Sequence, residues 1–270
     1  MGDLSQKCHL VRRVGRAKLV AYIVKATITS EAAVMHYITP PAVPRSIFCV
    51  GKNYPDHARE MATWEAWETA TEETHESEPI IFMKPGSALS AGGTTSIPSF
   101  DDKPISSNLH YEGELVLLIG KDTNEVSLDE ATACITGYGA GLDMTLRDVQ
   151  LEAKNAGYPW LKSKGFRNSA LVSEFISPDD AGAWRELSVT LRLNGEVRQH
   201  SLVSAMTFSP GYLVHYLSYI YGLCAGDLIF TGTPAGVGSV RPGDQLEVSL
   251  ETGGASAEPE RFVRLEAQVS

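Results

Sequence analysis

A chain of 270 residues, 43% hydrophobic and 21% charged, is long enough for one large domain, or two small ones, with a sizeable core. Its net charge of −10, from 23 Lys and Arg against 33 Asp and Glu, argues against nucleic acid as the main partner. The apolar runs are far shorter than the ~20 residues that a membrane helix needs, so we expect no membrane partner.

Cysteine usage and the N-terminus bear on the compartment. The four cysteines form no Cys-x-x-Cys pair, which favours reduced thiols in an intracellular protein over a zinc site or a disulfide framework. Between Leu4 and Ser30 there are six basic residues and no acidic one, as in organelle transit peptides. The alternative is an ordinary strand, because residues 19–28 are rich in β-branched side chains. We therefore expect a cytoplasmic protein, or a mitochondrial one if the basic segment is a targeting signal.

The first 45 residues are predicted to be an N-terminal extension. Residues 40–44 contain three prolines, which form a stiff connector that cannot be helical. We place the start of the main domain, residues 46–270, directly after it.

The next segment predicts a strand and a candidate general base. Residues 47–51 are typical of a short buried strand. Asn53 is expected to cap the helical turn that follows, which would place His57 and Glu60 on one face. A histidine held by a carboxylate is the usual form of a general base. The alternative is a surface pair without a catalytic role.

Residues 62–78 contain six glutamates and no Lys or Arg. Like charges at this density weaken a helix, so we predict a mobile acidic flap that Trp64 and Trp67 anchor. The flap is either a lid over a site or a solvated insertion. A strand over residues 80–83, a turn at Lys84 and a loop over 91–104 follow.

Glu112 and Glu114 directly precede the apolar residues 115–119. This uninterrupted apolar run predicts a strand that is buried on both faces. A strand alternates its side chains, so both carboxylates lie on one face. Buried carboxylates need a compensating cation or must take up protons. Two acids side by side suit Mg²⁺ or Mn²⁺ better than Zn²⁺, because the ligands are oxygens. The alternative is a solvated strand end; His110, of opposite parity, is expected to pack or to support the site.

Three alternating glycines lead to a further acidic residue, Asp143. Ser127 and Glu130 form a capping box that predicts a helix to about residue 136. Glycines at 137, 139 and 141 allow backbones to approach closely and deliver Asp143 to a crowded place. Asp143 is our candidate for the third metal carboxylate.

The following helix carries candidate substrate residues. Thr145 is predicted to cap it, and Arg147 and Gln150 lie three apart on one of its faces. The helix is expected to end at residues 158–160. Residues 162–167, which include Lys164, then form the densest positive cluster after the N-terminus.

From residue 187 onward the pattern is mainly β. Asn194-Gly195 predicts a tight hairpin, and residues 210–222 an amphipathic helix that ends at a glycine. After a buried strand at 226–230, the glycine-rich loop 231–238 offers N–H groups to an anion but lacks the Gly-Lys-Ser/Thr ending of a nucleotide-binding loop. A turn at 242–244 leads into a final strand pair.

Four ordered motifs resemble the fumarylacetoacetate hydrolase family over about residues 46–269. They are Val50-Gly51-Lys52-Asn53-Tyr54-x-x-His57-x-x-Glu60-Met61, His110-Tyr111-Glu112-x-Glu114, Leu142-Asp143-Met144-Thr145-x-Arg147-Asp148-Val149-Gln150, and Gly226-Asp227-x-Ile229-x-Thr231-Gly232-Thr233-Pro234-x-Gly236-Val237-Gly238. The resemblance implies an α+β, predominantly β fold: a mixed β-sandwich roll with short helices, usually in a homodimer. The long segment 61–79 and the first 45 residues depart from the family pattern.

The resemblance also implies roles for the candidate residues. Glu112, Glu114 and Asp143 would hold one Mg²⁺ or Mn²⁺, and His57 with Glu60 would activate water. Lys164 and Arg147 would face the anionic end of a small 2-oxo acid, with Gln150 and Thr233 nearby.

The implied activity is a metal-dependent hydrolase that cleaves the carbon–carbon bond of acylpyruvates and also decarboxylates oxaloacetate. Two alternatives stay open: an isomerase/decarboxylase or tautomerase of a 2-oxo acid, and a non-catalytic metal-binding protein.

Overall fold

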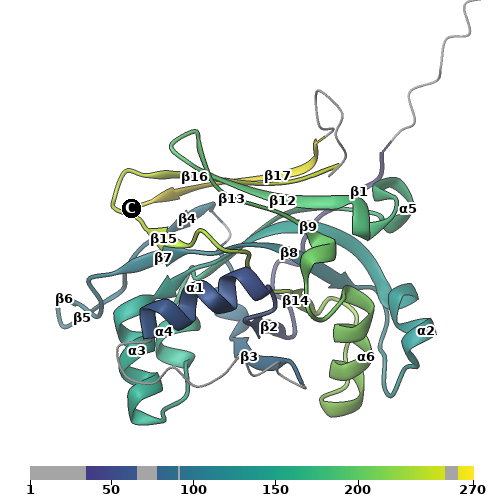
Figure 1. The fold of residues 1–270 in the computed structure, drawn as a ribbon, viewed down its shortest axis with the longest axis horizontal. Helices are drawn as coiled ribbons and strands as arrows, with labels where there is room; N and C mark the ends of the chain where they lie inside the picture. Colours follow the sequence, from purple (N-terminus) through teal and green to yellow (C-terminus); the bar gives the residue numbers. More distant parts are fainter. Residues whose placement is uncertain (1–34, 66–77, 91, 253–260) are drawn as a thin grey trace, which may run out of the picture. The chain divides into compact units, whose positions relative to one another are not determined.

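Two β-sheets that share one core organise the part of the chain that the structure describes (Figure 1). The structure is a computed structural model, and it describes residues 35–65, 78–90, 92–252 and 261–270. The basic N-terminal segment and most of the acidic segment, residues 66–77, lie outside the described residues, so the targeting signal and the flap stay predictions. Within the described residues, no helix has the length and apolar character to cross a membrane.

The larger sheet has seven strands in the order β1-β11-β9-β8-β14-β2-β3. Neighbours are antiparallel, except that β14 and β2 are parallel. Their bounds are β1 Tyr37–Ile38, β2 Ile47–Gly51, β3 Ile80–Lys84, β8 Gly113–Ile119, β9 Ile135–Asp143, β11 Ala170–Ile176 and β14 Leu228–Phe230. Strand β1 precedes the domain boundary placed at residue 46, so this sheet begins before the proline-rich connector; the division of residues 1–45 from the main domain stays a prediction.

The second sheet has five strands in the order β13-β12-β16-β17-β4, and the predicted hairpin joins β12 to β13. Asn194 and Gly195 both have positive φ, 52° and 84°, as a tight hairpin turn requires. The bounds are β4 Thr94–Thr95, β12 Leu187–Leu193, β13 Glu196–Leu202, β16 Gln245–Thr252 and β17 Arg261–Val269. Two small sheets complete the β structure of the described residues: β10 (Thr145–Leu146), β7 (Leu109–Tyr111) and β15 (Gly238–Ser239), and the pair β5 (Ser99–Phe100) and β6 (Lys103–Pro104).

Short helices connect the strands, as the sequence predicts for this mixed α+β fold. They are α1 Pro55–Glu65, α2 Leu128–Ala131, α3 Arg147–Ala156, α4 Leu161–Lys164, α5 Pro178–Ala181 and α6 Pro210–Ile220. The predicted helix at 210–222 is α6, which Ser209 caps by accepting a hydrogen bond from Tyr212 N.

Two predictions about helix caps are wrong. Asn53 does not cap α1: its side chain hydrogen-bonds with Phe208 and the carbonyl of Thr231. Thr145 lies in β10 and donates to the carbonyl of Asp143, so α3 begins without a side-chain cap. In both cases tertiary pairing overrides the local signal. The helix predicted after Ser127 is present as α2 and a 3₁₀ helix over Thr132–Cys134, and it ends two residues before the predicted end because β9 begins at residue 135.

Strand β8 separates two hydrophobic clusters, because its side chains alternate between them. Leu115, Leu117 and Ile119 belong to the large core between the sheets. Val116 and Leu118 belong to a smaller core on the opposite face, with Ile47 and Phe230 among its members. All of β8 is buried, as predicted. Glu112 and Glu114 therefore lie at the end of the face that carries the smaller core.

The alternating glycines of β9 make room for aromatic and branched side chains. A Cβ at Gly141 would lie 2.4 Å from Cγ2 of Val116 and 2.8 Å from Cε1 of Phe230. A Cβ at Gly139 would lie 2.8 Å from two ring atoms of Phe175. The predicted crowding around these glycines is confirmed, but the atoms that approach them are mainly side chains and not, as predicted, backbones.

Gly141→Ala should destabilise the protein, because no atom around the new methyl group is the far end of a flexible chain. We expect the free energy of unfolding to fall by about 1–3 kcal/mol, which thermal unfolding can measure. Gly92→Ala is the matched control, since its Cβ would meet nothing within 4 Å. Equal melting temperatures for the two variants would contradict the prediction.

Candidate metal centre and active site

Three carboxylates converge at the junction of β8 and β9. The register pairs Gly113 with Leu142 and Glu114 with Gly141, and the N–H of Asp143 donates to the carbonyl of Glu112 at 2.9 Å. Glu112, Glu114 and Asp143 therefore share one face. Their exposed fractions are 5%, 2% and 1%, and each offers a carboxylate oxygen within 4.8 Å of the others. The structure thus brings together the three acids that the sequence singles out.

Three cationic side chains surround these acids. Lys164 Nζ lies 2.7 Å from Glu112 Oε2 and 2.8 Å from Asp143 Oδ2. Arg147 Nη2 lies 2.5 Å from Glu112 Oε1, while its Nη1 donates to Gln150 Oε1 at 2.6 Å. Lys84 Nζ lies 2.7 Å from Asp143 Oδ1. The acids are therefore in direct contact with Lys164 and Arg147. Gln150 contacts Arg147.

The two glutamates differ in their electrostatics. Burial raises the pKa of Glu112, but the charges of Lys164 and Arg147 outweigh it and hold that pKa well below the usual range. Burial, and then the charges of Asp143 and Glu112, raise the pKa of Glu114 well above its usual range. Burial lowers the pKa of Lys164, but Asp143 and Glu112 outweigh it and raise that pKa.

The donor set fits a hard divalent cation. All three candidate ligands are carboxylate oxygens, the type that Mg²⁺ and Mn²⁺ prefer. Among the described residues, the hydrogen-bond partner of Glu114 is the N–H of Gly232, 2.8 Å from Oε2. A buried carboxyl group with two acids beside it and one amide donor is the group that a cation would most stabilise.

The candidate base lies on helix α1. His57 Nδ1 is 3.2 Å from Glu60 Oε2, and His57 is only 5% exposed. The N–H of Gly236 donates to both carboxylate oxygens of Glu60 at 3.2 Å. Burial raises the pKa of Glu60, but the bonds from His57 and Gly236 outweigh it and lower that pKa. Glu60 is thus an ionised, anchored acceptor that orients the His57 ring.

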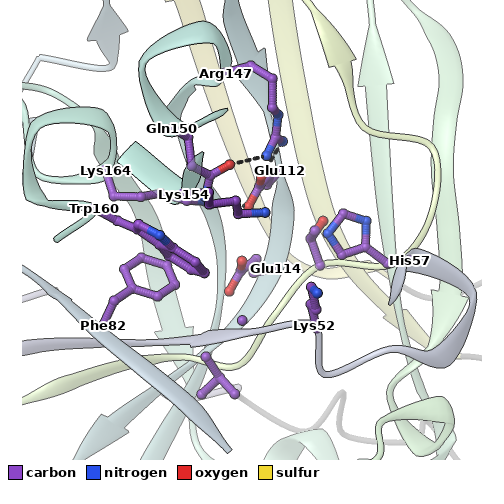
Figure 2. Close-up of a pocket in the computed structure, with 13 residues that line it drawn as sticks. Lys52, His57, Phe82, Glu112, Glu114, Arg147, Gln150, Lys154, Trp160 and Lys164 are labelled. Carbon is purple, nitrogen blue, oxygen red and sulfur yellow. Dashed lines mark hydrogen bonds and ion pairs between the residues drawn. The ribbon is translucent and has the colours of Figure 1, made fainter. Parts of the chain in front are cut away.

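The candidate base and two of the candidate metal ligands line one pocket. His57, Glu112 and Glu114 line it together, and Figure 2 shows the imidazole and the two carboxylates facing a common space. Arg147, Gln150, Lys164 and Thr233 line it as well. The hydroxyl of Thr233 donates to the carbonyl of Gly113 at 2.9 Å, so it also fixes the start of β8.

The glycine-rich loop 231–238 donates hydrogen bonds to carboxyl groups of the protein itself. Its N–H groups at Gly232 and Gly236 donate to Glu114 and Glu60. The loop therefore connects the candidate metal ligands to the candidate base.

Four side chains at or beneath the pocket are not predicted from the sequence: Lys84, Phe82, Trp160 and Lys154. The sequence predicts a turn at Lys84, but this residue ends β3 and is 1% exposed. Lys154 had a signal, because it follows Arg147 and Gln150 at helical spacing on α3. His110 lies in β7 opposite Thr145 and is not part of the cluster of three carboxylates. Burial, and then the charge of Arg147, lower its pKa to about 4, so it is neutral near pH 7.

Asp148 ties the loop before Glu112 to the start of α3. Its Oδ1 accepts from Ser106 Oγ at 2.5 Å, and its Oδ2 accepts from the N–H of Ser107 at 2.8 Å. Burial raises the pKa of Asp148, but these hydrogen bonds outweigh it and lower that pKa. Asp148 therefore helps to hold Arg147 and Glu112 in register.

Asp148→Asn should reduce the free energy of unfolding at pH 7 by about 1.5–3 kcal/mol, the range for hydrogen bonds to a charged group. The folded pKa is below the ordinary value of 3.8, so the unfolded chain takes up the proton first as pH falls. The contribution is therefore present above about pH 4 and is lost as the pH falls through the folded pKa.

Melting temperatures of the wild type and Asp148→Asn between pH 7 and pH 3 should converge at the acid end. Asp129→Asn, an exposed position on α2, removes the same charge as a control. A difference in melting temperature that stays constant with pH would contradict this role for the Asp148 carboxylate.

Comparison with known proteins places the chain in a family. The family model described as fumarylacetoacetate (FAA) hydrolase C-terminal matches residues 46–270. The chain belongs to the fumarylacetoacetate hydrolase family, whose members are enzymes, so the resemblance of the four motifs is confirmed.

Relatives with specific names cover most of the chain. The human protein "Oxaloacetate tautomerase FAHD1, mitochondrial" is 39% identical over 207 residues, 76% of this chain and 87% of the relative. The Escherichia coli protein "Oxaloacetate tautomerase YcgM" is 38% identical over 207 residues, 76% of this chain and 88% of the relative.

A solved structure also bears on the site. The crystal structure of fumarylpyruvate hydrolase from Pseudomonas aeruginosa in complex with Mn²⁺ and pyruvate matches with a TM-score of 0.69 and 32% identity. The match covers 87% of this chain and 98% of that protein. The fold is therefore that of the family, as predicted.

Proposed function

We propose that this protein is a divalent-metal-dependent hydrolase that cleaves acylpyruvates to pyruvate and a carboxylic acid. The observation that carries the proposal is the pocket that His57, held by Glu60, shares with the buried carboxylates Glu112 and Glu114. A purely structural cation site needs no oriented histidine beside it. The pyruvate and Mn²⁺ of the Pseudomonas aeruginosa relative support the substrate class and the cofactor.

Glu112, Glu114 and Asp143 would hold the cation, Mg²⁺ or Mn²⁺. When bound, it would supply Lewis-acid polarisation of the 2-oxo acid group and offset the negative charge that develops there.

His57 would act as the general base. Because Glu60 contacts Nδ1, the other ring nitrogen, Nε2, is left to take a proton from water. The resulting hydroxide adds to C4, the acyl carbonyl. The C3–C4 bond would then break, and its electron pair would stay on C3 as the pyruvate enolate. The proton that His57 took from water would be returned to C3, which gives pyruvate and the neutral histidine.

Lys164 and Arg147 would stabilise the anionic end of the substrate. Both contact Glu112, so each cation would lie beside the enolate charge if the 2-oxo acid group binds at the carboxylates. Gln150, held by Arg147, would orient the carboxylate of the substrate, and Thr233 would lie beside the substrate in the same pocket.

Oxaloacetate would follow the same route without water, because its C4 is already a carboxylate that leaves as CO₂. A second candidate activity is tautomerisation of oxaloacetate, which the names of the human and Escherichia coli relatives favour. It needs the same enolate stabilisation and a proton transfer at C3, but no bond cleavage.

A pyruvate-release assay with Mg²⁺ on acetylpyruvate, fumarylpyruvate and oxaloacetate tests the proposal. Stoichiometric pyruvate and carboxylic acid from a 2,4-dioxo acid would support hydrolysis. Loss of the ultraviolet absorbance of enol-oxaloacetate without any pyruvate would favour the tautomerase. Thermal stabilisation by Mg²⁺ with neither reaction would favour a non-catalytic metal-binding protein.

The homodimer and the compartment stay predictions. The mammalian relative is named as mitochondrial, which supports the expectation for the basic segment between Leu4 and Ser30.

A further inference from the structure

A buried glutamine binds the backbone between two of the candidate metal ligands. Gln199 belongs to β13 and is 1% exposed. Its Oε1 accepts a hydrogen bond from the N–H of Gly113 at 2.9 Å. Its Nε2 donates to the hydroxyl of Thr233 at 2.8 Å and to the carbonyl of Pro234 at 2.7 Å. One side chain of the five-stranded sheet therefore joins the start of β8 to the glycine-rich loop.

The partners of this amide fix its orientation. A backbone N–H can only donate and a carbonyl can only accept, so Oε1 must face Gly113 and Nε2 must face Pro234. The Thr233 hydroxyl accepts from Nε2 and donates to the carbonyl of Gly113 at 2.9 Å. Both polar groups of the Gly113 backbone are thus bound, one by Gln199 directly and the other through Thr233.

Two features of the backbone bring Gln199 to this position. Strands β12 and β13 pair Leu191 with Gln199 and then Arg192 with Val197, so β13 bulges at the residue in between. A bulge redirects the neighbouring side chain, and among the residues of β13 only Gln199 is buried. A Cβ at Gly113 would lie 3.2 Å from Gln199 Oε1, so the glycine permits the contact.

The glycine-rich loop extends this connection to the candidate base. The N–H of Gly232 donates to Glu114, and the N–H of Gly236 donates to Glu60. Gln199 holds the loop between these two glycines. Loss of the Gln199 amide would therefore free both donors to move relative to β8.

We propose that Gln199 is a positioning residue, which fixes Glu112 and Glu114 relative to the glycine-rich loop so that their carboxylates are arranged to bind the divalent cation. Gln199 is not among the described residues that line the pocket, so it acts through Gly113 and Thr233 and not on the substrate. The inference rests on the proposed function for the role of the acids as metal ligands.

Gln199→Met tests the inference, because methionine is unbranched and of similar length but cannot donate to the loop and is only a weak acceptor for Gly113. Calorimetric titration of the metal-free protein with Mn²⁺ should show binding about tenfold weaker than in the wild type, the lower end of the loss expected when a group that orients metal ligands is removed. At saturating Mn²⁺, the kcat of acetylpyruvate hydrolysis should fall as well, because the loop also holds Glu60.

Thr190→Val is the matched control. Thr190 is 2% exposed on β12, and its hydroxyl is hydrogen-bonded with His200 and Glu251. This variant loses buried hydrogen bonds in the same sheet without changing the contacts of the loop. Its melting temperature should fall while its Mn²⁺ affinity stays that of the wild type. Gln268→Met, at an exposed position of β17, should change neither quantity.

Gln199→Asn is a second variant for the case that Gln199→Met does not fold. It keeps the amide but shortens the side chain by one methylene, so the amide cannot reach Gly113 and Pro234 together. Its Mn²⁺ affinity should fall in the same direction. A cooperative melting transition shows that a variant is folded.

Unchanged Mn²⁺ affinity in a folded Gln199 variant would overturn the inference, and so would an equal loss in Thr190→Val or a wild type that does not bind Mn²⁺. Failure of both Gln199 variants to fold would assign the residue to the stability of the whole sheet and would overturn it too. The proposed function fails separately: a wild type that binds Mn²⁺ but releases no pyruvate contradicts the hydrolase alone, while weaker Mn²⁺ binding in Gln199→Met still supports the positioning role.

Discussion

Glu114→Gln should abolish metal-induced stabilisation and pyruvate release without destabilising the metal-free protein. The wild-type carboxyl group is 2% exposed and has two acids beside it, which raise its pKa. A neutral amide of the same shape removes that repulsion, so the metal-free variant should melt at the same temperature as the wild type or higher. Saturating Mg²⁺ or Mn²⁺ should stabilise only the wild type, by about 2.7 kcal/mol at one hundred times the dissociation constant.

Melting curves with and without the cation measure this difference independently of activity. Glu174→Gln makes the same change at an exposed position of β11 and should retain the full metal response. An equal metal response in Glu114→Gln and the wild type would show that the cation binds elsewhere.

His57→Ala should reduce acylpyruvate hydrolysis by about 10²–10⁴-fold, the usual contribution of a positioned general base. Decarboxylation of oxaloacetate should fall far less, because that reaction needs no water. The ratio of the two kcat/KM values, measured on one preparation, therefore reports the base directly. Equal losses on both substrates would refute this division of labour.

Glu60→Gln should reproduce part of the His57→Ala effect. An amide can still accept a hydrogen bond from Nδ1, but it stabilises the protonated ring less than a carboxylate does. His215→Ala, in α6 and outside the pocket lining, is a control for loss of a histidine. A larger loss in Glu60→Gln than in His57→Ala would show that Glu60, and not His57, carries the proton.

The sequence predicted those parts of the fold that local patterns determine. Strand β8, the hairpin at Asn194-Gly195 and helix α6 each have a period or a turn residue that permits few other structures. The three acids were found because two lie on a recognisable buried strand and the third follows a run of alternating glycines. Their convergence depends on the β8–β9 register, which no local pattern specifies.

The parts that sequence reasoning missed depend on long-range contacts. Asn53 and Thr145 are good capping residues, yet both use their side chains for partners that the tertiary structure supplies. The sequence predicts a turn at Lys84 and not a buried ion pair, because the partner, Asp143, is 59 positions away in the chain. The burial of a lysine becomes intelligible only once that carboxylate is placed beside it.

The β8–β9 register restricts where the chain can gain or lose residues. Asp143 meets Glu112 only because every residue from Gly113 to Leu118 has a fixed partner on β9. Deleting one residue within β9 would turn the Asp143 side chain to the opposite face of the sheet. Asp143 would then no longer lie beside Glu112 and Glu114. The connection at residues 120–134 lies outside that register, so an insertion at one of its exposed positions, such as Lys121 or Asp122, would leave the pairing of β8 with β9 unchanged.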